Sequence, residues 1–301
     1  MLRIGSRGSQ LALWQTRWVA ARLQQLGHPT EIEIIKTTGD KITDVALSKV
    51  GAKGLFTKEL EEALLARTVD LAVHSLKDMP TDLPEGLALT AIPEREDARD
   101  AVVGKTLAQL PNGARVGTSS LRRSAQLRLF RPDLVIESVR GNIDTRLRKL
   151  DEGQFDSIVL AAAGLRRLGL ASRIAELLDH DIMCPAVGQG ALALETRDGD
   201  DPAAVAVRRL DHPRTAAAVR AERAVLRGLG GGCQVPIGAY AIIQGERLHL
   251  MAVVIAPDAS QMIRRRSHGA VSDAESIGAE LARELREEGA ARILETVYGA
   301  Q

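Results

Sequence analysis

The sequence predicts an α/β protein with two doubly wound lobes and a small α+β domain toward the C-terminal end. Two observations predict the lobes. Short apolar strands alternate with amphipathic helices from residue 2 onward, and the alternation starts again after the charged stretch at residues 93–100. A third observation predicts the last domain, because three strand-like runs joined by short turns lie within residues 239–267. A chain of 301 residues has room for two or three such units.

The composition is that of a soluble globular protein, with 45% hydrophobic and 26% charged residues. Aromatic residues make up only 2%, so we expect a core of Leu, Val, Ile and Ala. The formal net charge of +1 and the scarcity of aromatics argue against a nucleic-acid partner. No apolar run approaches the roughly 20 residues of a membrane span, and the first residues lack the apolar core of a signal peptide. We therefore expect a cytoplasmic protein without a membrane partner and, since no coiled-coil pattern is found, a monomer.

The first lobe begins with a strand, a short turn and a helix. We expect strands at residues 2–4, 31–36, 71–73 and 88–92, and helices at residues 10–26 and 56–67. The turn at residues 5–9 is rich in glycine and serine, and its backbone N–H groups together with Arg7 suit an anion. Many turns of this kind bind nothing, so the motif alone is a weak indication.

Residues 38–54 form a long connection with little periodicity. Glycines alternate with Lys49 and Lys53, which makes the segment a candidate lid over an anionic ligand. The alternative is a disordered surface loop.

The rest of the chain is organised around residues 70–80. Leu71 to Val73 predict a buried strand, and the polar run that follows, stopped by Pro80, predicts a loop at the carboxyl end of that strand. Open α/β sheets keep their chemistry at that end. Lys77 and Asp78 would lie together there, and Asp78 is the first catalytic candidate. The alternative is a surface turn whose charges are solvated.

The second lobe repeats the alternation, with strands expected at residues 115–117, 134–137 and 157–160 and helices at residues 119–130 and 142–150. Such alternation predicts a mainly parallel sheet covered on both faces. Arginines stand at three strand-to-helix junctions, namely Arg122 with Arg123, Arg140 with Arg146, and Arg167. Junctions of this type lie at one edge of the sheet, so the guanidinium groups converge and favour a polyanionic ligand over a merely solvated surface.

The turn-rich segment at residues 185–190 precedes a strand at residues 191–195 and is interpreted as a return to the first lobe. The first domain would then be discontinuous, and a ligand would lie between the lobes. The predicted domains are residues 1–94 with 190–212, residues 95–189, and residues 213–301. For the remaining chain we expect helices at residues 202–210, 214–229 and 272–288, and antiparallel strands at residues 239–243, 248–256 and 261–267.

The two cysteines, Cys184 and Cys233, lie far apart and form no C-x-x-C spacing, so neither a metal site nor a disulfide framework is predicted. Cys184 stands among apolar residues and is expected to be a buried, inert thiol. Cys233 follows three glycines, which clear space around its thiol for a large attached group.

With these pieces assembled, the sequence resembles the porphobilinogen deaminase family, also called hydroxymethylbilane synthases, of tetrapyrrole biosynthesis. The resemblance runs over essentially the whole chain. It is carried by the motifs at residues 3–15, 49–56, 74–80, 116–123, 140–142, 185–190 and 231–236.

The resemblance implies two lobes with the topology of type 2 periplasmic solute-binding proteins and a third domain. It also implies a dipyrromethane cofactor joined to Cys233 by a thioether. The family adds four porphobilinogen molecules head to tail on this primer, loses ammonia at each step and releases hydroxymethylbilane.

Residue roles follow from the same resemblance. Asp78 and Lys77 would be catalytic. The cofactor would be bound by Cys233, Arg122, Arg123, Ser120, Thr118, Lys77, Asp78 and Gly190. The substrate would be bound by Arg7, Ser9, Arg140, Arg146, Arg167, Lys49, Lys53, Phe56, Ser75 and Ser119. Each pyrrole carries an acetate and a propionate, which arginines hold by bidentate pairs. Loss of ammonia leaves an electron-poor pyrrole, whose positive charge a carboxylate at Asp78 stabilises.

Two rival functions remain open at this point. A solute-binding or effector-sensing protein of the same fold would account for the arginines, but it has no use for Cys233 on its glycine-rich segment. A generic anion-binding transferase would predict no covalently attached pyrrole.

Overall fold

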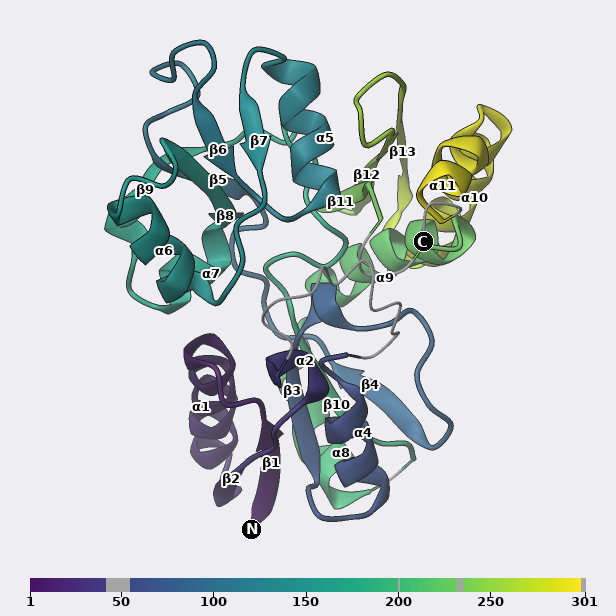
Figure 1. The fold of residues 1–301 in the computed structure, drawn as a ribbon. Coiled ribbons are helices and arrows are strands. Elements are labelled where there is room, and N and C mark those ends of the chain that lie inside the picture. Colours follow the sequence, from purple (N-terminus) through teal and green to yellow (C-terminus); the bar gives the residue numbers. More distant parts are fainter. Residues whose placement is uncertain (42–54, 200, 232–234, 299–301) are drawn as a thin grey trace.

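The computed structural model describes residues 1–41, 55–199, 201–231 and 235–298, which form three β-sheets with helices packed on them (Figure 1). Two of the sheets build the two lobes, and the third builds a separate domain beside the second lobe. Cys233, Lys49 and Lys53 lie outside the described residues.

The sheet of the first lobe has the strand order β2-β1-β3-β10-β4. Its strands are β1 (Leu2–Ser6), β2 (Thr30–Ile34), β3 (Leu71–Ser75), β4 (Leu87–Ala91) and β10 (Leu192–Arg197). Its helices are α1 (Gln10–Gln25), α2 (Thr38–Lys41), α4 (Lys58–Leu65) and α8 (Pro202–Arg208). β1 pairs in parallel with β2 and β3, whereas β10 is antiparallel to both of its neighbours, β3 and β4.

The sheet of the second lobe has the equivalent order, β7-β6-β8-β5-β9. Its strands are β5 (Asp100–Gly104), β6 (Arg115–Gly117), β7 (Val135–Glu137), β8 (Ser157–Ala161) and β9 (Ile174–Leu177). Its helices are α5 (Leu121–Phe130), α6 (Ile143–Asp151), α7 (Ala162–Arg167) and the 3-10 turn η2 (Ala171–Arg173). Here β5 is the antiparallel strand, between β8 and β9.

In each lobe the antiparallel strand is the one that enters from the other lobe. β5 follows the first crossover, at residues 92–99, and β10 follows the return crossover, at residues 178–191. The predicted two-lobed α/β architecture is thereby confirmed, and each sheet is mixed rather than wholly parallel. The sequence analysis missed β5 and β9, because the apolar run Ala101 to Val103 adjoins a charged stretch and β9 is half exposed.

The third sheet is antiparallel, in the order β11-β12-β13, as predicted. Its strands are β11 (Ile237–Gln244), β12 (Arg247–Ile255) and β13 (Met262–Ala270). One face is covered by α9 (Pro213–Gly228), the 3-10 turn η3 (Val271–Asp273), α10 (Ala274–Glu287) and α11 (Ala290–Tyr298), of which α11 was not predicted as a separate helix.

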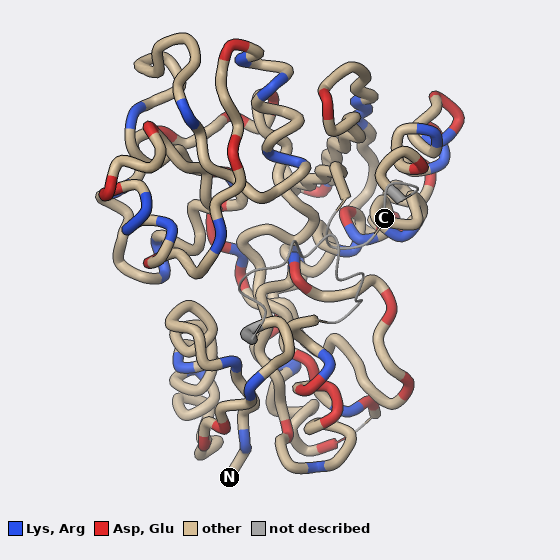
Figure 2. Tube along the Cα trace, viewed as in Figure 1, with Lys and Arg blue, Asp and Glu red and all other residues tan. Residues whose placement is uncertain are grey.

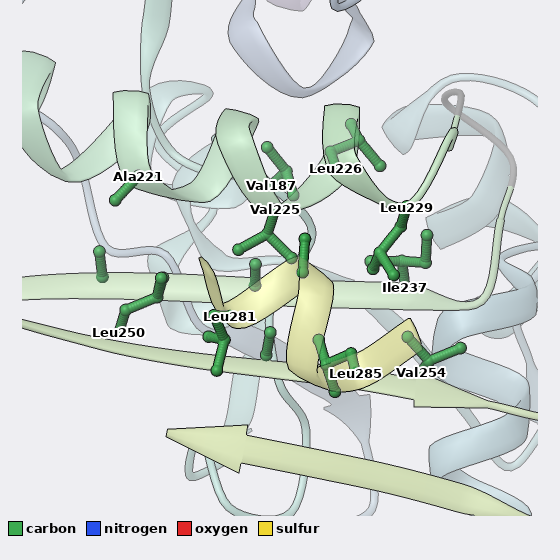
Figure 3. Close-up of a cluster of buried hydrophobic side chains, with 14 of the residues drawn as sticks. Val187, Ala221, Val225, Leu226, Leu229, Ile237, Leu250, Val254, Leu281 and Leu285 are labelled. Atoms are coloured by element: carbon green, nitrogen blue, oxygen red, sulfur yellow. The ribbon is translucent and has the colours of Figure 1, made fainter. Parts of the chain in front are cut away.

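The cores are aliphatic, as the low aromatic content requires. In the third domain Val225 of α9, Leu250 of β12 and Leu281 of α10 belong to one buried cluster (Figure 3). A Cβ at Gly278 would lie 2.2 Å from the carbonyl oxygen of Ala221, so glycine at this position lets α9 and α10 approach closely.

Basic and acidic residues are interspersed along all parts of the chain (Figure 2), consistent with the formal net charge of +1. Within the described ranges, no helix combines the length and the apolar character needed to cross a membrane. In the same ranges, no group of three or more His, Cys, Asp or Glu side chains is arranged to hold a metal ion.

Candidate active site

The carboxyl end of β3 leads directly into the 3-10 turn η1 (Leu76–Asp78), where a loop was predicted. Leu76 is 1% exposed, and its backbone N–H donates to the carbonyl oxygen of Ala191 at 3.0 Å. A Cβ at Gly188, whose φ is +68°, would lie 2.0 Å from Leu76 Cδ2, so the return crossover packs tightly over this leucine. Burial of Leu76 therefore closes the turn and leaves Lys77 and Asp78 only partly buried.

Ser75, the last residue of β3, is held by the first helix. The Gln15 side-chain amide donates to Ser75 Oγ at 2.8 Å, and Gln15 is itself 2% exposed. The entrance of η1 is thus fixed by α1 as well as by the sheet.

Arg122 and Arg123 enter the site from the first turn of α5, and both side chains are buried. Arg122 donates to Asp100 Oδ2 at 2.8 Å and to the carbonyl oxygen of Cys184 at 2.6 Å. Arg123 donates to Asp100 Oδ1 at 2.8 Å and to the carbonyl oxygen of Val159 at 3.1 Å. The Asp100 carboxylate therefore accepts hydrogen bonds from two guanidinium groups.

The positive charges of the two lobes lie close enough to influence one another. Burial, with the nearby Arg123, lowers the pKa of Lys77 to about 8, although Asp78 and Asp100 act in the opposite direction. Burial and Arg123 also lower the pKa of Arg146 to about 10. Arg123 of the second lobe therefore influences both Lys77 of the first lobe and Arg146 of its own lobe, which is the direction of the predicted convergence.

Arg167 and Gly190 meet at the crossovers. Arg167 donates to the carbonyl oxygen of Gly190 at 2.6 Å, and burial lowers the pKa of Arg167 to about 10. Gly190 has a φ of +88°, and a Cβ there would lie 2.4 Å from the carbonyl oxygen of Glu96. The contact requires glycine, so this position shapes the crossover without offering a side chain.

The predicted hydroxyl residues are largely engaged in local structure. Ser9 accepts from the backbone N–H of Ala12 at 3.3 Å and caps α1, and Ser120 caps α5 in the same way. Thr118 Oγ1 accepts from the backbone N–H of Ser120 at 3.3 Å. Ser119 Oγ donates to the carbonyl oxygen of Val139 at 2.7 Å. These hydroxyls order two helix N-termini, which carry partial positive charge.

The other predicted residues in the described part of the chain make local contacts within their own lobes. Arg7 lies with its guanidinium carbon 4.2 Å from the centre of the Phe56 ring, a cation–π contact within the first lobe. Arg146 Nε donates to the carbonyl oxygen of Gly141 at 2.8 Å, and Arg140 is half-buried just before α6.

Sequence analysis missed two residues of this region, Asp100 and Gln189. Both side chains are fully buried, and Gln189 donates to Asp100 Oδ1 at 3.0 Å. Asp100 could have been found from its place at the start of the apolar run of β5. The sequence analysis instead treats Asp100 as the last residue of the charged stretch at residues 93–100.

Fold and site together define a class: a two-lobed α/β protein with a cluster of cationic side chains to which both lobes contribute. Residues 2–205 match the family model described as porphobilinogen deaminase, dipyromethane cofactor binding domain, and residues 216–287 match its C-terminal domain. A curated porphobilinogen deaminase from Pelobacter propionicus is 52% identical over 301 residues, 99% of this chain and 97% of that protein. One from Syntrophotalea carbinolica is 54% identical over 299 residues, 97% and 95% of the two chains. The chain belongs to the porphobilinogen deaminase family.

Solved structures with a related shape are much more distant. An ABC-transporter periplasmic substrate-binding protein from Coxiella burnetii aligns with a TM-score of 0.44 and 16% identity, over 74% of this chain and 97% of that chain. We therefore describe the two-lobed fold from the strand orders given above.

The side chains of the site fit the dipyrromethane that the family description names. Such a group carries several carboxylates, and here Lys77, Arg122, Arg123 and Arg146 outnumber the nearby Asp78 and Asp100. The excess positive charge suits a polycarboxylate ligand.

Proposed function

We propose that this chain joins four porphobilinogen molecules head to tail into hydroxymethylbilane, releasing ammonia at each addition, on a covalently bound dipyrromethane primer. Membership of the family supports the reaction. The observation that carries the proposal is the cluster of Lys77, Arg123 and Arg146 beside Asp78, because it combines carboxylate binding with a single candidate catalytic carboxylate.

In this proposal Cys233 forms the thioether to the primer, which supplies an electron-rich pyrrole carbon to which the first substrate unit is joined. Arg122, Arg123 and Lys77 hold its acetate and propionate groups, and the N-terminus of α5, ordered by Thr118 and Ser120, adds partial positive charge. Gly190, which has no side chain, allows the close approach of the two crossovers at the carbonyl oxygen of Glu96.

Asp78 is proposed as the catalytic carboxylate. It accepts hydrogen bonds from pyrrole N–H groups and stabilises the positive charge that develops when porphobilinogen loses ammonia. It is also placed to hold or move the proton of the leaving amine, with Lys77 beside it.

Incoming substrate is assigned to the residues around this centre: Arg7, Ser9, Lys49, Lys53, Phe56, Ser75, Ser119, Arg140, Arg146 and Arg167. Their shared property is a guanidinium, ammonium or hydroxyl group suited to carboxylates. Phe56 differs, and its ring supports Arg7 through the cation–π contact.

The division into domains 1–94 with 190–212, 95–189 and 213–301 belongs to the same proposal, and the three sheets support it. The same proposal includes a monomeric, cytoplasmic protein that binds no nucleic acid. The formal net charge of +1 supports the last of these, the absence of a nucleic-acid partner.

The decisive experiment is the intact mass of freshly purified protein with peptide mapping around Cys233. A mass excess equal to two linked pyrrole units on that thiol is the expected result. If the thiol is bare, the protein is incubated with porphobilinogen or preformed hydroxymethylbilane, because a host can yield apoprotein. A thiol that stays bare after incubation would overturn the proposed reaction and leave a solute-binding relative.

A further inference from the structure

Asp100 is a fully buried carboxylate, and its hydrogen-bond partners in the described part of the chain are all donors. Besides Arg122 and Arg123, it accepts from the Gln189 side-chain amide at 3.0 Å. Burial alone would raise the pKa of Asp100, but Arg122 and Arg123 lower it far below its usual range. The carboxylate therefore stays charged.

The partners of the arginine pair come from both crossovers. Asp100 begins β5, directly after the first crossover, whereas Gln189 and Cys184 belong to the return crossover. Gln189 also donates to the carbonyl oxygen of Ala98 at 2.7 Å, which ties the two crossovers to each other. The orientation of both guanidinium groups thus depends on the arrangement of the segments that join the lobes.

The charge of Asp100 also reaches the first lobe. Burial is the main cause of the lowered pKa of Lys77; Arg123 and Arg122 lower this pKa further, and Asp78 and Asp100 raise it. Asp100 is the carboxylate of this set that the reaction does not need as a catalytic group.

We propose that Asp100, braced by Gln189, is a positioning residue that aims Arg122 and Arg123 at the carboxylates of the ligand. It touches neither substrate nor cofactor and acts through the two guanidinium groups. The proposal rests on the proposed function for the identity of the ligand, and the direction in which Asp100 moves the pKa of Lys77 supports it.

The coupling is measured without catalysis. Purified protein is labelled with acetic anhydride at a series of pH values, and the acetylation rate of Lys77 is followed by peptide mass, with the exposed Lys58 as internal reference. In the unaltered chain the midpoint is expected near pH 8. Asp100→Asn removes the negative charge and nearly keeps the shape, so the midpoint is expected to fall by about one pH unit.

Asp133→Asn is the matched control. Asp133 forms a 2.6 Å ion pair with Arg131 in the same lobe, but it is not among the groups that influence Lys77. Its Lys77 midpoint should equal that of the unaltered chain. An unchanged midpoint in folded Asp100→Asn would remove the charge coupling to Lys77, and normal loading of pyrrole at Cys233 in that variant would overturn the proposal.

Asp100→Glu keeps the negative charge but moves it by the length of one methylene. It is the alternative test of the positioning role if Asp100→Asn does not give a cooperative melting transition. The Lys77 midpoint is expected to stay near pH 8, while the fraction of chains carrying pyrrole at Cys233 falls at least about fivefold because the arginines are misplaced. Normal loading in this variant would overturn the positioning role. A Cys233 thiol that stays bare in the unaltered chain after incubation with porphobilinogen or hydroxymethylbilane would refute the proposed function instead, and the Lys77 titration would still decide the charge coupling.

Discussion

The two lobes share a strand order, and in each the strand received from the other lobe bears a fully buried carboxylate. In the second lobe this is Asp100 on β5, and in the first it is Glu195 on β10. Asp100 is surrounded by two guanidinium groups and an amide. Glu195 receives only His74 Nε2, at 3.0 Å, and its Oε1 has no hydrogen-bond partner among the described residues.

The difference shows how one topology serves two purposes. Fixed guanidinium partners keep the second-lobe carboxylate charged. The first-lobe carboxylate lies beside His74, and it acts with burial to raise the pKa of Glu61. The second lobe thus surrounds its carboxylate with fixed ion pairs, whereas the first lobe contains Glu61 and Lys77, whose pKa values burial shifts.

The largest expected effect tests the chemical role of the first lobe. Asp78→Ala should fold normally and lower the rate of hydroxymethylbilane formation by roughly a thousandfold, because the carboxylate that stabilises developing positive charge is lost. The rate is measured with thermal melting as a check of folding. Asp82→Ala is the control, since Asp82 is an exposed carboxylate four residues further along the chain. Near-normal turnover in Asp78→Ala would remove the catalytic assignment.

The next effect tests the permanent charge of the second lobe. Arg123→Met leaves Asp100 buried with one guanidinium partner fewer, at an expected cost of about 3 kcal/mol in the free energy of unfolding. Urea denaturation measures it. Arg131→Met, which breaks a solvent-accessible pair with Asp133, should lower the free energy of unfolding much less. Equal costs for the two variants would erase the distinction between the buried and the exposed pairs.

A smaller effect concerns Lys77 of the first lobe, whose pKa depends on charged groups of the second lobe. Lys77 has a pKa of about 8, so it loses its positive charge as the pH rises above that value and binds carboxylates less well. KM for porphobilinogen should rise by up to about tenfold per pH unit above pH 8. Lys77→Arg stays charged and should flatten this rise. If KM rises equally above pH 8 in the unaltered chain and in Lys77→Arg, the rise must come from a group other than Lys77.

The smallest effect concerns the raised pKa of Glu61 in the first lobe. Burial raises the pKa of Glu61, and Glu195 acts in the same direction, so the folded state favours the protonated acid. This stability is present below the ordinary pKa of glutamate and is lost as the pH rises through the raised value. Glu61→Gln should therefore melt with a shallower pH dependence, differing by a fraction of a kcal/mol. Parallel melting curves across that range would contradict the raised pKa.

Local patterns predicted most elements, because apolar runs and glycine or proline turns act over a few residues. They also placed Lys77 and Asp78 at the end of β3 and Arg122 and Arg123 at the start of α5, whereas Arg167, predicted at a strand-to-helix junction, is the last residue of α7. The antiparallel insertion of β5 and β10 could not be predicted, since it depends on pairing between distant segments. For the same reason the His74–Glu195 pair, separated by 121 residues, left no local signal.

The insertion of β10 between β3 and β4 has a consequence for synthesis on the ribosome. The first lobe begins at Leu2, yet its sheet stays open at the centre until residue 197 has been made. The second lobe draws all its strands from the continuous stretch between Asp100 and Leu177, so it is the first unit able to close its sheet. The half of the chain that emerges first is therefore completed only after the half that follows it.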